Sequence, residues 1–119
     1  MEEKRSRQEE YVRQVLDAYR RTPGTTGNVG RPDHHLAAQL YQRDIPLTAV
    51  ENALVLAAAR RLLRPANAAP LAAVRSLAYF VPVIDEVLAR KVSPDYFQYL
   101  RGKISRFSSQ AASDPPTSL

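Results

Sequence analysis

The segment that most constrains this chain is a run of seven residues, 53–59, that reads ALVLAAA and contains no polar or charged side chain. It lies in the second half of a longer stretch, residues 36–64, whose first half has the spacing of a helix–turn–helix. A helix that is apolar on nearly every side must be surrounded by other elements of the fold. The sequence therefore predicts a central helix around which a small all-α domain is packed.

The spacing of the other apolar residues predicts a compact bundle of about five helices. Val15, Leu16 and Tyr19, for example, follow the three- and four-residue steps of a buried helix face. The predicted helices cover residues 9–21, 32–43, 47–64, 76–91 and 96–107, and the second and third form a helix–turn–helix-like pair. We expect residues 1–8 to be a frayed N-terminus or a helical overhang, 9–107 to be the helical domain, and 108–119 to be a disordered tail.

Several residues indicate how individual helices begin or break. Thr48 and Glu51 have the spacing of a capping box at the start of the third helix. Ser76 is a candidate cap for the fourth helix. Pro82 removes a backbone hydrogen bond inside that helix, so we expect a short piece ending near Phe80 and a longer piece through residue 91.

Length and composition exclude several classes of protein. The chain has 119 residues, enough for one domain with a single core. It has no cysteine, which excludes disulfides and thiolate chemistry and fits a reducing compartment. No apolar run approaches the roughly 20 residues of a membrane span, and no apolar signal segment follows the charged first residues. We therefore expect a cytoplasmic protein with no membrane association.

The supply of catalytic or metal-binding side chains is small. His34 and His35 are the only histidines, and adjacent residues on a helix point about 100° apart, which does not suit one metal ion. Asp85 and Glu86 are adjacent in the same way, and we expect Glu86 to pair with Arg90 four residues later. We expect no enzymatic activity, no metal and no cofactor.

The formal net charge of +5 and the pI near 9.9 favour a polyanionic partner, although the same charges could simply solvate the surface. Exposed aromatic rings beside cations suit single-stranded nucleic acid, because bases stack on the rings and phosphates contact the charges. If Tyr96 and Tyr99 pack inward with Leu100 and Ile104, Phe97 is left exposed beside the cations of the last helix. The candidate nucleic-acid-binding residues are Arg60, Arg61, Arg64, Phe97, Arg101, Lys103 and Arg106.

The helix–turn–helix-like pair raises a second way of binding DNA. In that motif, the N-terminal half of the second helix enters the major groove. Here that half offers Thr48, Ala49, Glu51 and Asn52, of which only Asn52 is a good base-recognising residue, and Glu51 would repel phosphate. The pattern therefore indicates the structural element more than sequence-specific recognition.

Three strings also resemble a known kind of domain: LAAQLYQRDIPLTAVENALVLAAARR, VRSLAYFVPVIDEVL and YFQYLRGKI. Together they are similar in layout to the DnaD-type helical domain of replication-initiator and accessory proteins of bacterial mobile elements. The resemblance covers roughly residues 11–104 and implies DNA binding, often without strong sequence preference, and assembly with replication or transposition proteins. The sequence departs from the DnaD-type pattern at Asp44, where such a turn favours glycine. It also lacks the winged-helix domain that commonly accompanies such domains.

These observations predict a non-enzymatic, basic helical DNA-binding or replication/transposition accessory protein that binds mainly through phosphate contacts. The alternative is a protein–protein interaction module, or a small helical subunit or adaptor that docks a protein partner or its own copy. The alternative depends on small apolar residues that permit close helix packing: Ala57, Ala58, Ala59, Ala68, Ala69, Ala72 and Ala73.

Overall fold

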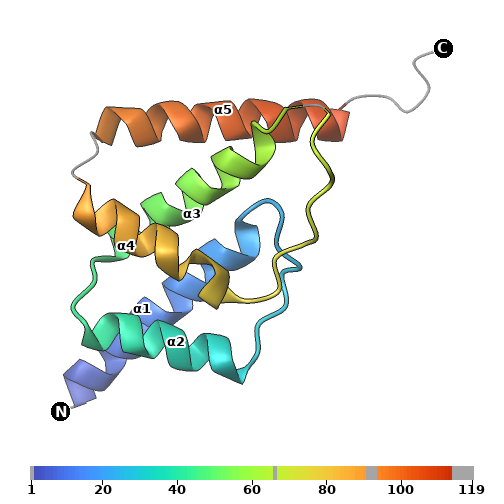
Figure 1. The fold of residues 1–119 in the computed structure, drawn as a ribbon. Coiled ribbons are helices and arrows are strands. Elements are labelled where there is room, and N and C mark those ends of the chain that lie inside the picture. Colours follow the sequence, from blue (N-terminus) through green and yellow to red (C-terminus); the bar gives the residue numbers. More distant parts are fainter. Residues whose placement is uncertain (1, 66, 91–93, 114–119) are drawn as a thin grey trace.

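The computed structural model describes residues 2–65, 67–90 and 94–113, and these ranges contain five α-helices and one short 3₁₀ helix (Figure 1). Within them there is no β-strand, and the β-type pairing found there is an isolated bridge between Thr25 and Val74. The predicted all-α bundle of about five helices is confirmed, and α2 and α3 follow each other through a short turn. Its elements are α1 (Glu2–Arg21), α2 (Arg31–Gln42), α3 (Leu47–Leu62), η1 (Leu77–Phe80), α4 (Val81–Ala89) and α5 (Pro94–Ser113).

The first and last helices are longer than the apolar pattern predicts. α1 begins at Glu2, so the residues expected to be frayed or a helical overhang continue the helix. α5 extends to Ser113, six residues past the predicted end at residue 107. The rest of the predicted tail, residues 114–119, lies outside the described residues. Ser93, whose position directly before Pro94 predicts a helix cap, also lies outside them.

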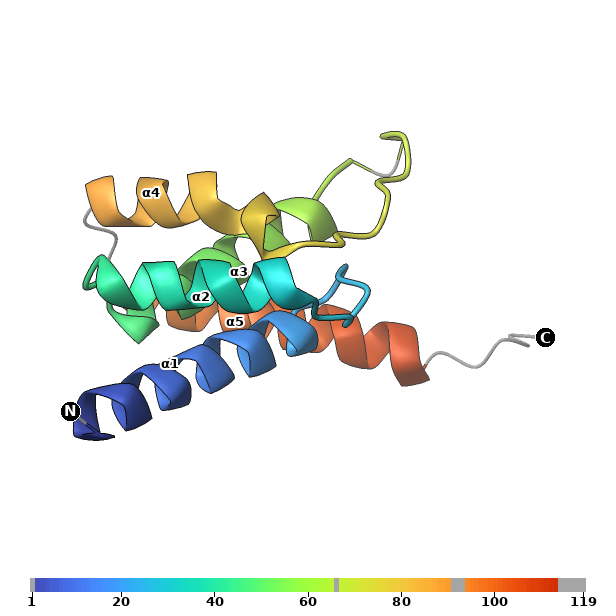
Figure 2. The ribbon, with the colours of Figure 1, turned by 90° about the horizontal axis from the view of Figure 1, so that it is seen from below.

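The predicted central helix is confirmed as α3. It contacts α1, α4 and α5, and it lies between α5 on one side and α1 on the other (Figures 1 and 2). In the run 53–59, every residue is buried except Val55, which is partly exposed. The three consecutive alanines Ala57, Ala58 and Ala59 are therefore used for close packing inside this domain.

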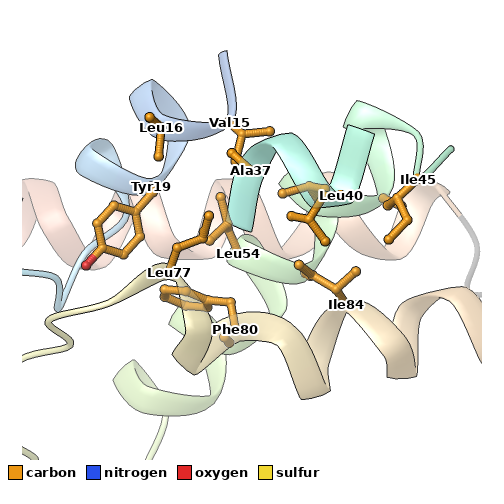
Figure 3. Close-up of a cluster of buried hydrophobic side chains, with 14 of the residues drawn as sticks. Val15, Leu16, Tyr19, Ala37, Leu40, Ile45, Leu54, Leu77, Phe80 and Ile84 are labelled. Carbon is orange, nitrogen blue, oxygen red and sulfur yellow. The ribbon is translucent and has the colours of Figure 1, made fainter. Parts of the chain in front are cut away.

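The main core is built by side chains from α1, α2, α3, η1 and α4 (Figure 3). Tyr19 and Phe80 meet edge to face with their ring centroids 5.9 Å apart, and both are essentially inaccessible to solvent. Burying a side chain of this size contributes about 1.5–3 kcal/mol, so this core accounts for much of the stability of so short a chain. The residues labelled in Figure 3 are Val15, Leu16, Tyr19, Ala37, Leu40, Ile45, Leu54, Leu77, Phe80 and Ile84.

One predicted cap and one predicted break are confirmed, and a second predicted cap is wrong. The Ser76 hydroxyl accepts a hydrogen bond from the Ala78 amide at 3.1 Å and caps η1. Pro82 lies in the first turn of α4, so the fourth helix is divided into η1 and α4 as expected. The capping box of Thr48 and Glu51 does not form, because the chain enters α3 through Pro46 with no side-chain cap.

The turn between α2 and α3 contains the left-handed residue that the family pattern would fill with glycine. Asp44 has a φ angle of 59°, a conformation that Asp tolerates better than most residues. The Asp44 amide donates to the Tyr41 carbonyl at 3.0 Å, and the Ile45 amide donates to the Leu40 carbonyl at 3.1 Å. These bonds close the C-terminal end of α2 and direct the chain into α3.

Candidate nucleic-acid interface

The orientation of α5 determines which aromatic residues are available at the surface, and here the sequence prediction is wrong. Phe97 is only 3% exposed, whereas Tyr96 and Tyr99 are 45% and 54% exposed. Phe97 and Leu100 form a second small core with Leu56 of α3. The ring predicted to stack on bases is therefore buried, and the two tyrosines predicted to be buried lie at the surface.

Two tyrosines and two basic residues of α5 lie on one face of the helix. Tyr96, Tyr99, Lys103 and Arg106 are three, four and three residues apart, the spacing of neighbours along a helix surface. The Lys103 Nζ lies 3.3 Å from the Tyr99 hydroxyl oxygen and 5.6 Å from the centroid of the Tyr99 ring. We call these four residues the α5 stripe. It combines exposed π surface with two positive charges.

At the end of α3, Arg60 is held against α4 by a paired hydrogen bond. Its two terminal nitrogens donate to the two carboxylate oxygens of Glu86 at 2.6 and 2.7 Å, and Arg90 reaches the same carboxylate at 3.1 Å, as the sequence predicts. The hydrogen bonds from Arg60 lower the pKa of Glu86. The pKa of Arg60 is raised, chiefly by Glu86, with a smaller contribution from the Tyr96 phenol. The group of Arg60, Glu86 and Arg90 thus carries one net positive charge near the start of the α5 stripe.

The other two arginines at the end of α3 hold the irregular segment that follows. Arg61 donates to the Ala72 carbonyl at 2.8 Å, and its guanidinium carbon lies 5.7 Å from the centroid of the Tyr79 ring. Arg64 donates to the Ala69 carbonyl at 2.7 Å. Both arginines line a hollow of about 330 Å³ beside Pro23. They are part of the fold, and much of their hydrogen-bonding capacity is used there.

Arg101 lies on a different flank of α5 from the stripe. It donates to the side-chain oxygen of Asn52 at 2.9 Å. Asn52 is the base-recognising candidate of the helix–turn–helix face, and its neighbour Ala49 is only 8% exposed. α5 packs against α3, so the N-terminal half of α3 does not present a free face in the way that groove insertion requires. The geometry argues against recognition of duplex DNA by this pair.

The predicted site residues are thus distributed over three places. Lys103 and Arg106 belong to the α5 stripe, and Arg60 lies near it. Arg61 and Arg64 hold the segment that follows α3. Arg101 lines a groove between α1, α3 and α5. The exposed tyrosines Tyr96 and Tyr99 are not among the predicted site residues. Their exposure could have been predicted, because Phe97, Leu100 and Ile104 also have the spacing of a regular apolar helix face.

The acidic and histidine side chains do not gather into a second kind of site. His34 and His35 are exposed, and Asp85 forms an exposed ion pair with Arg43 at 3.6 Å. In the described ranges, no three His, Asp or Glu side chains are placed to hold one metal ion.

No family model, curated protein or solved structure matches this chain. Among the helices that the structure describes, none is long and apolar enough to cross a bilayer. The surface feature that bears most on function is the α5 stripe.

Proposed function

We propose that this chain is a non-enzymatic, basic helical protein that binds DNA mainly through its phosphates. The observation that carries the proposal is the α5 stripe, in which the partly exposed Lys103 and the exposed Arg106 lie on the same helix face as two exposed aromatic rings. The net charge of +5 adds a long-range attraction to any polyanion. The resemblance to DnaD-type domains supports DNA as the polyanion, and a role as an accessory factor in replication or transposition of a bacterial mobile element.

The proposal assigns different roles to the predicted cations. Lys103 and Arg106 make direct phosphate contacts, because neither forms an ion pair with an acidic side chain in the part of the chain that the structure describes. Arg60 contributes only the net charge that it and Arg90 leave after pairing with Glu86. Arg61 and Arg64 act mainly on the fold, so their removal would change stability as well as binding.

Fluorescence anisotropy with labelled DNA over a series of salt concentrations tests this function. Each phosphate contact changes the slope of log K against log [salt] by about 0.7–0.9, so removing two contacts should reduce it by roughly 1.5. We expect this loss in the double variant Lys103→Gln/Arg106→Gln. The control is Arg7→Gln/Arg20→Gln on α1, which removes the same charge at exposed positions.

The two double variants separate local binding from general attraction. An equal, small loss in both would show that the net charge matters and the stripe does not. Absence of salt-sensitive binding in the parent protein would overturn the proposed function altogether. Far-ultraviolet circular dichroism confirms that each variant remains helical.

A specific feature also favours a protein-interaction module as a second candidate. A groove of about 580 Å³ lies between α1, α3 and α5, with Leu54, Val55 and Ile104 among its apolar residues. Its charged residues are two cations, Arg21 and Arg101, and one acid, Glu51. These features suit an amphipathic helix with acidic residues along its flanks. Close packing through Ala57, Ala58 and Ala59 no longer supports this candidate, since all three are buried within the domain. Sedimentation velocity over a range of concentrations would detect self-association.

A further inference from the structure

Two tyrosines on one exposed helix face are unusual enough to need an explanation. Tyr96 and Tyr99 are each about half exposed, while the neighbouring Phe97 and Leu100 provide the apolar anchors that attach α5 to α3. Both tyrosine rings lie outside the two cores, although Tyr96 makes an edge-to-face contact with Phe97 at a centroid distance of 6.0 Å. Tyrosine offers a stiff π surface with a polar edge, which suits contact with a partner that is both flat and hydrated.

We infer that the α5 stripe binds single-stranded nucleic acid, with bases stacked on Tyr96 and Tyr99 and phosphates contacted by Lys103 and Arg106. This inference rests on the proposed function and adds the form of nucleic acid that is preferred. Unpaired bases have free faces that can stack on aromatic rings, whereas bases in a duplex are already stacked on one another.

The positions of the charges fit this arrangement. From Tyr96 to Arg106 the stripe is about 15 Å long at 1.5 Å per residue, enough for a short tract of nucleotides. The rings occupy the N-terminal part and the two cations the C-terminal part. At the other end of the stripe, the two positive charges of Arg60 and Arg90 are matched by the two negative charges of Glu86 and Asp95, so the cationic part of the surface is the C-terminal part. Bases and phosphates thus have separate places along one helix.

Duplex DNA fits this surface less well than single-stranded DNA does. Duplex recognition by α2 and α3 would require the N-terminal half of α3, where Ala49 is buried and Asn52 is held by Arg101 of α5. A duplex could still contact Lys103 and Arg106 through its phosphates, but it would gain nothing from the tyrosine rings. Removing the two tyrosine rings should therefore weaken the binding of single-stranded DNA more than the binding of duplex DNA.

The test compares a labelled oligothymidine of about 15 nucleotides, within the site sizes of single-strand-binding folds, with a duplex of the same length. The double variant Tyr96→Ala/Tyr99→Ala should bind the oligothymidine at least tenfold more weakly, because each lost stacking contact typically costs a factor of about five or more. Duplex binding and the salt dependence of both should remain close to those of the parent protein, since no charge is removed.

The conservative control is Tyr96→Phe/Tyr99→Phe, which keeps both rings and should retain the affinity for the oligothymidine. The chain has no tryptophan, so quenching of tyrosine fluorescence by the oligothymidine gives a second signal, and this quenching should decrease in the alanine variant. If the alanine variant binds both forms as well as the parent does, the inference that bases stack on the tyrosines is wrong, and the proposed binding through phosphates is unaffected. If it loses equal affinity for both forms, the preference for single strands is wrong. If the parent binds neither form even at low salt, the proposed function fails as well.

Discussion

Asp33 offers the sharpest test of how the domain is held together. Its side chain is only 5% exposed, and its carboxylate joins the start of α2 to the start of η1. One oxygen accepts the Gly30 amide at 2.8 Å, and the other accepts the Leu77 amide at 2.9 Å, 44 residues along the chain. The Ser76 hydroxyl also lies 3.4 Å from the second oxygen. Replacing Asp33 with alanine removes all of these acceptors at once.

The expected loss follows from the environment of each donor. Leu77 is completely buried, so its amide would lose its acceptor and gain little from water, at a cost of about 1–3 kcal/mol. Gly30 is exposed, so water can replace most of that bond, but the favourable charge at the helix N-terminus, worth about 0.3–1 kcal/mol, is also lost. Asp33→Ala should therefore lower the free energy of unfolding by about 2–4 kcal/mol. Asp33→Asn keeps one acceptor oxygen and should lose roughly half as much.

Urea unfolding followed by circular dichroism at 222 nm measures both losses. With an m-value of about 1.5 kcal/mol/M, the alanine variant should unfold at a midpoint roughly 1.5–2.5 M lower than the parent. The control is Asp85→Ala, which breaks an exposed pair with Arg43 and should change stability by less than about 0.5 kcal/mol. The reasoning is refuted if Asp33→Ala is no more destabilising than this control, or if Asp33→Asn costs as much as Asp33→Ala.

Two further predictions concern Tyr11 and Gly24. Burial raises the pKa of Tyr11 to about 12, so its contribution to stability is fully present below pH 10 and is lost as the pH rises from 10 to 12. Urea titrations across that range should show a steeper loss in the parent than in Tyr11→Phe, and parallel curves would contradict this. Gly24 has a φ angle of 93°, and a Cβ there would lie 2.9 Å from the Arg61 Nε, so Gly24→Ala should lower the thermal midpoint. Gly27→Ala, with a φ angle of 79° but no atom within 4 Å, should cost less, and an equal loss would mean that the contact with Arg61 is unimportant.

Much of the fold can be predicted from the sequence because its strongest signals are local. The uncharged run 53–59 identifies the central helix, and Pro82 divides the fourth helix at the expected place. The long-range polar contacts could not be predicted in this way. Asp33 has the position of an ordinary N-terminal helix acid, and nothing near it in sequence indicates that it accepts a hydrogen bond from Leu77. The bridge between Thr25 and Val74 likewise joins two irregular segments that have no strand pattern.

The candidate site was predicted less well, because amphipathic patterns do not fix the rotation of a helix when two apolar faces compete. In α5, one face carries Tyr96 and Tyr99 and the adjacent face carries Phe97, Leu100 and Ile104. The structure buries the second face, since phenylalanine and leucine lose less on leaving water than tyrosine, whose hydroxyl would then need a partner. This preference does not bury every large apolar residue, because Leu88 near the end of α4 is 43% exposed.

The arginines at the end of α3 show why a cluster of positive charges in a sequence is weak grounds for a binding site. Arg60, Arg61 and Arg64 look equivalent in the sequence, yet one pairs with a carboxylate and two bind backbone carbonyls of the segment that follows α3. A cation already engaged in this way must break or share those hydrogen bonds to contact a phosphate, so its gain on binding is reduced. Lys103 has no carboxylate partner in the interactions found here, and it lies over an exposed ring. The binding surface is therefore better identified by which charges the fold leaves available than by how many the sequence contains.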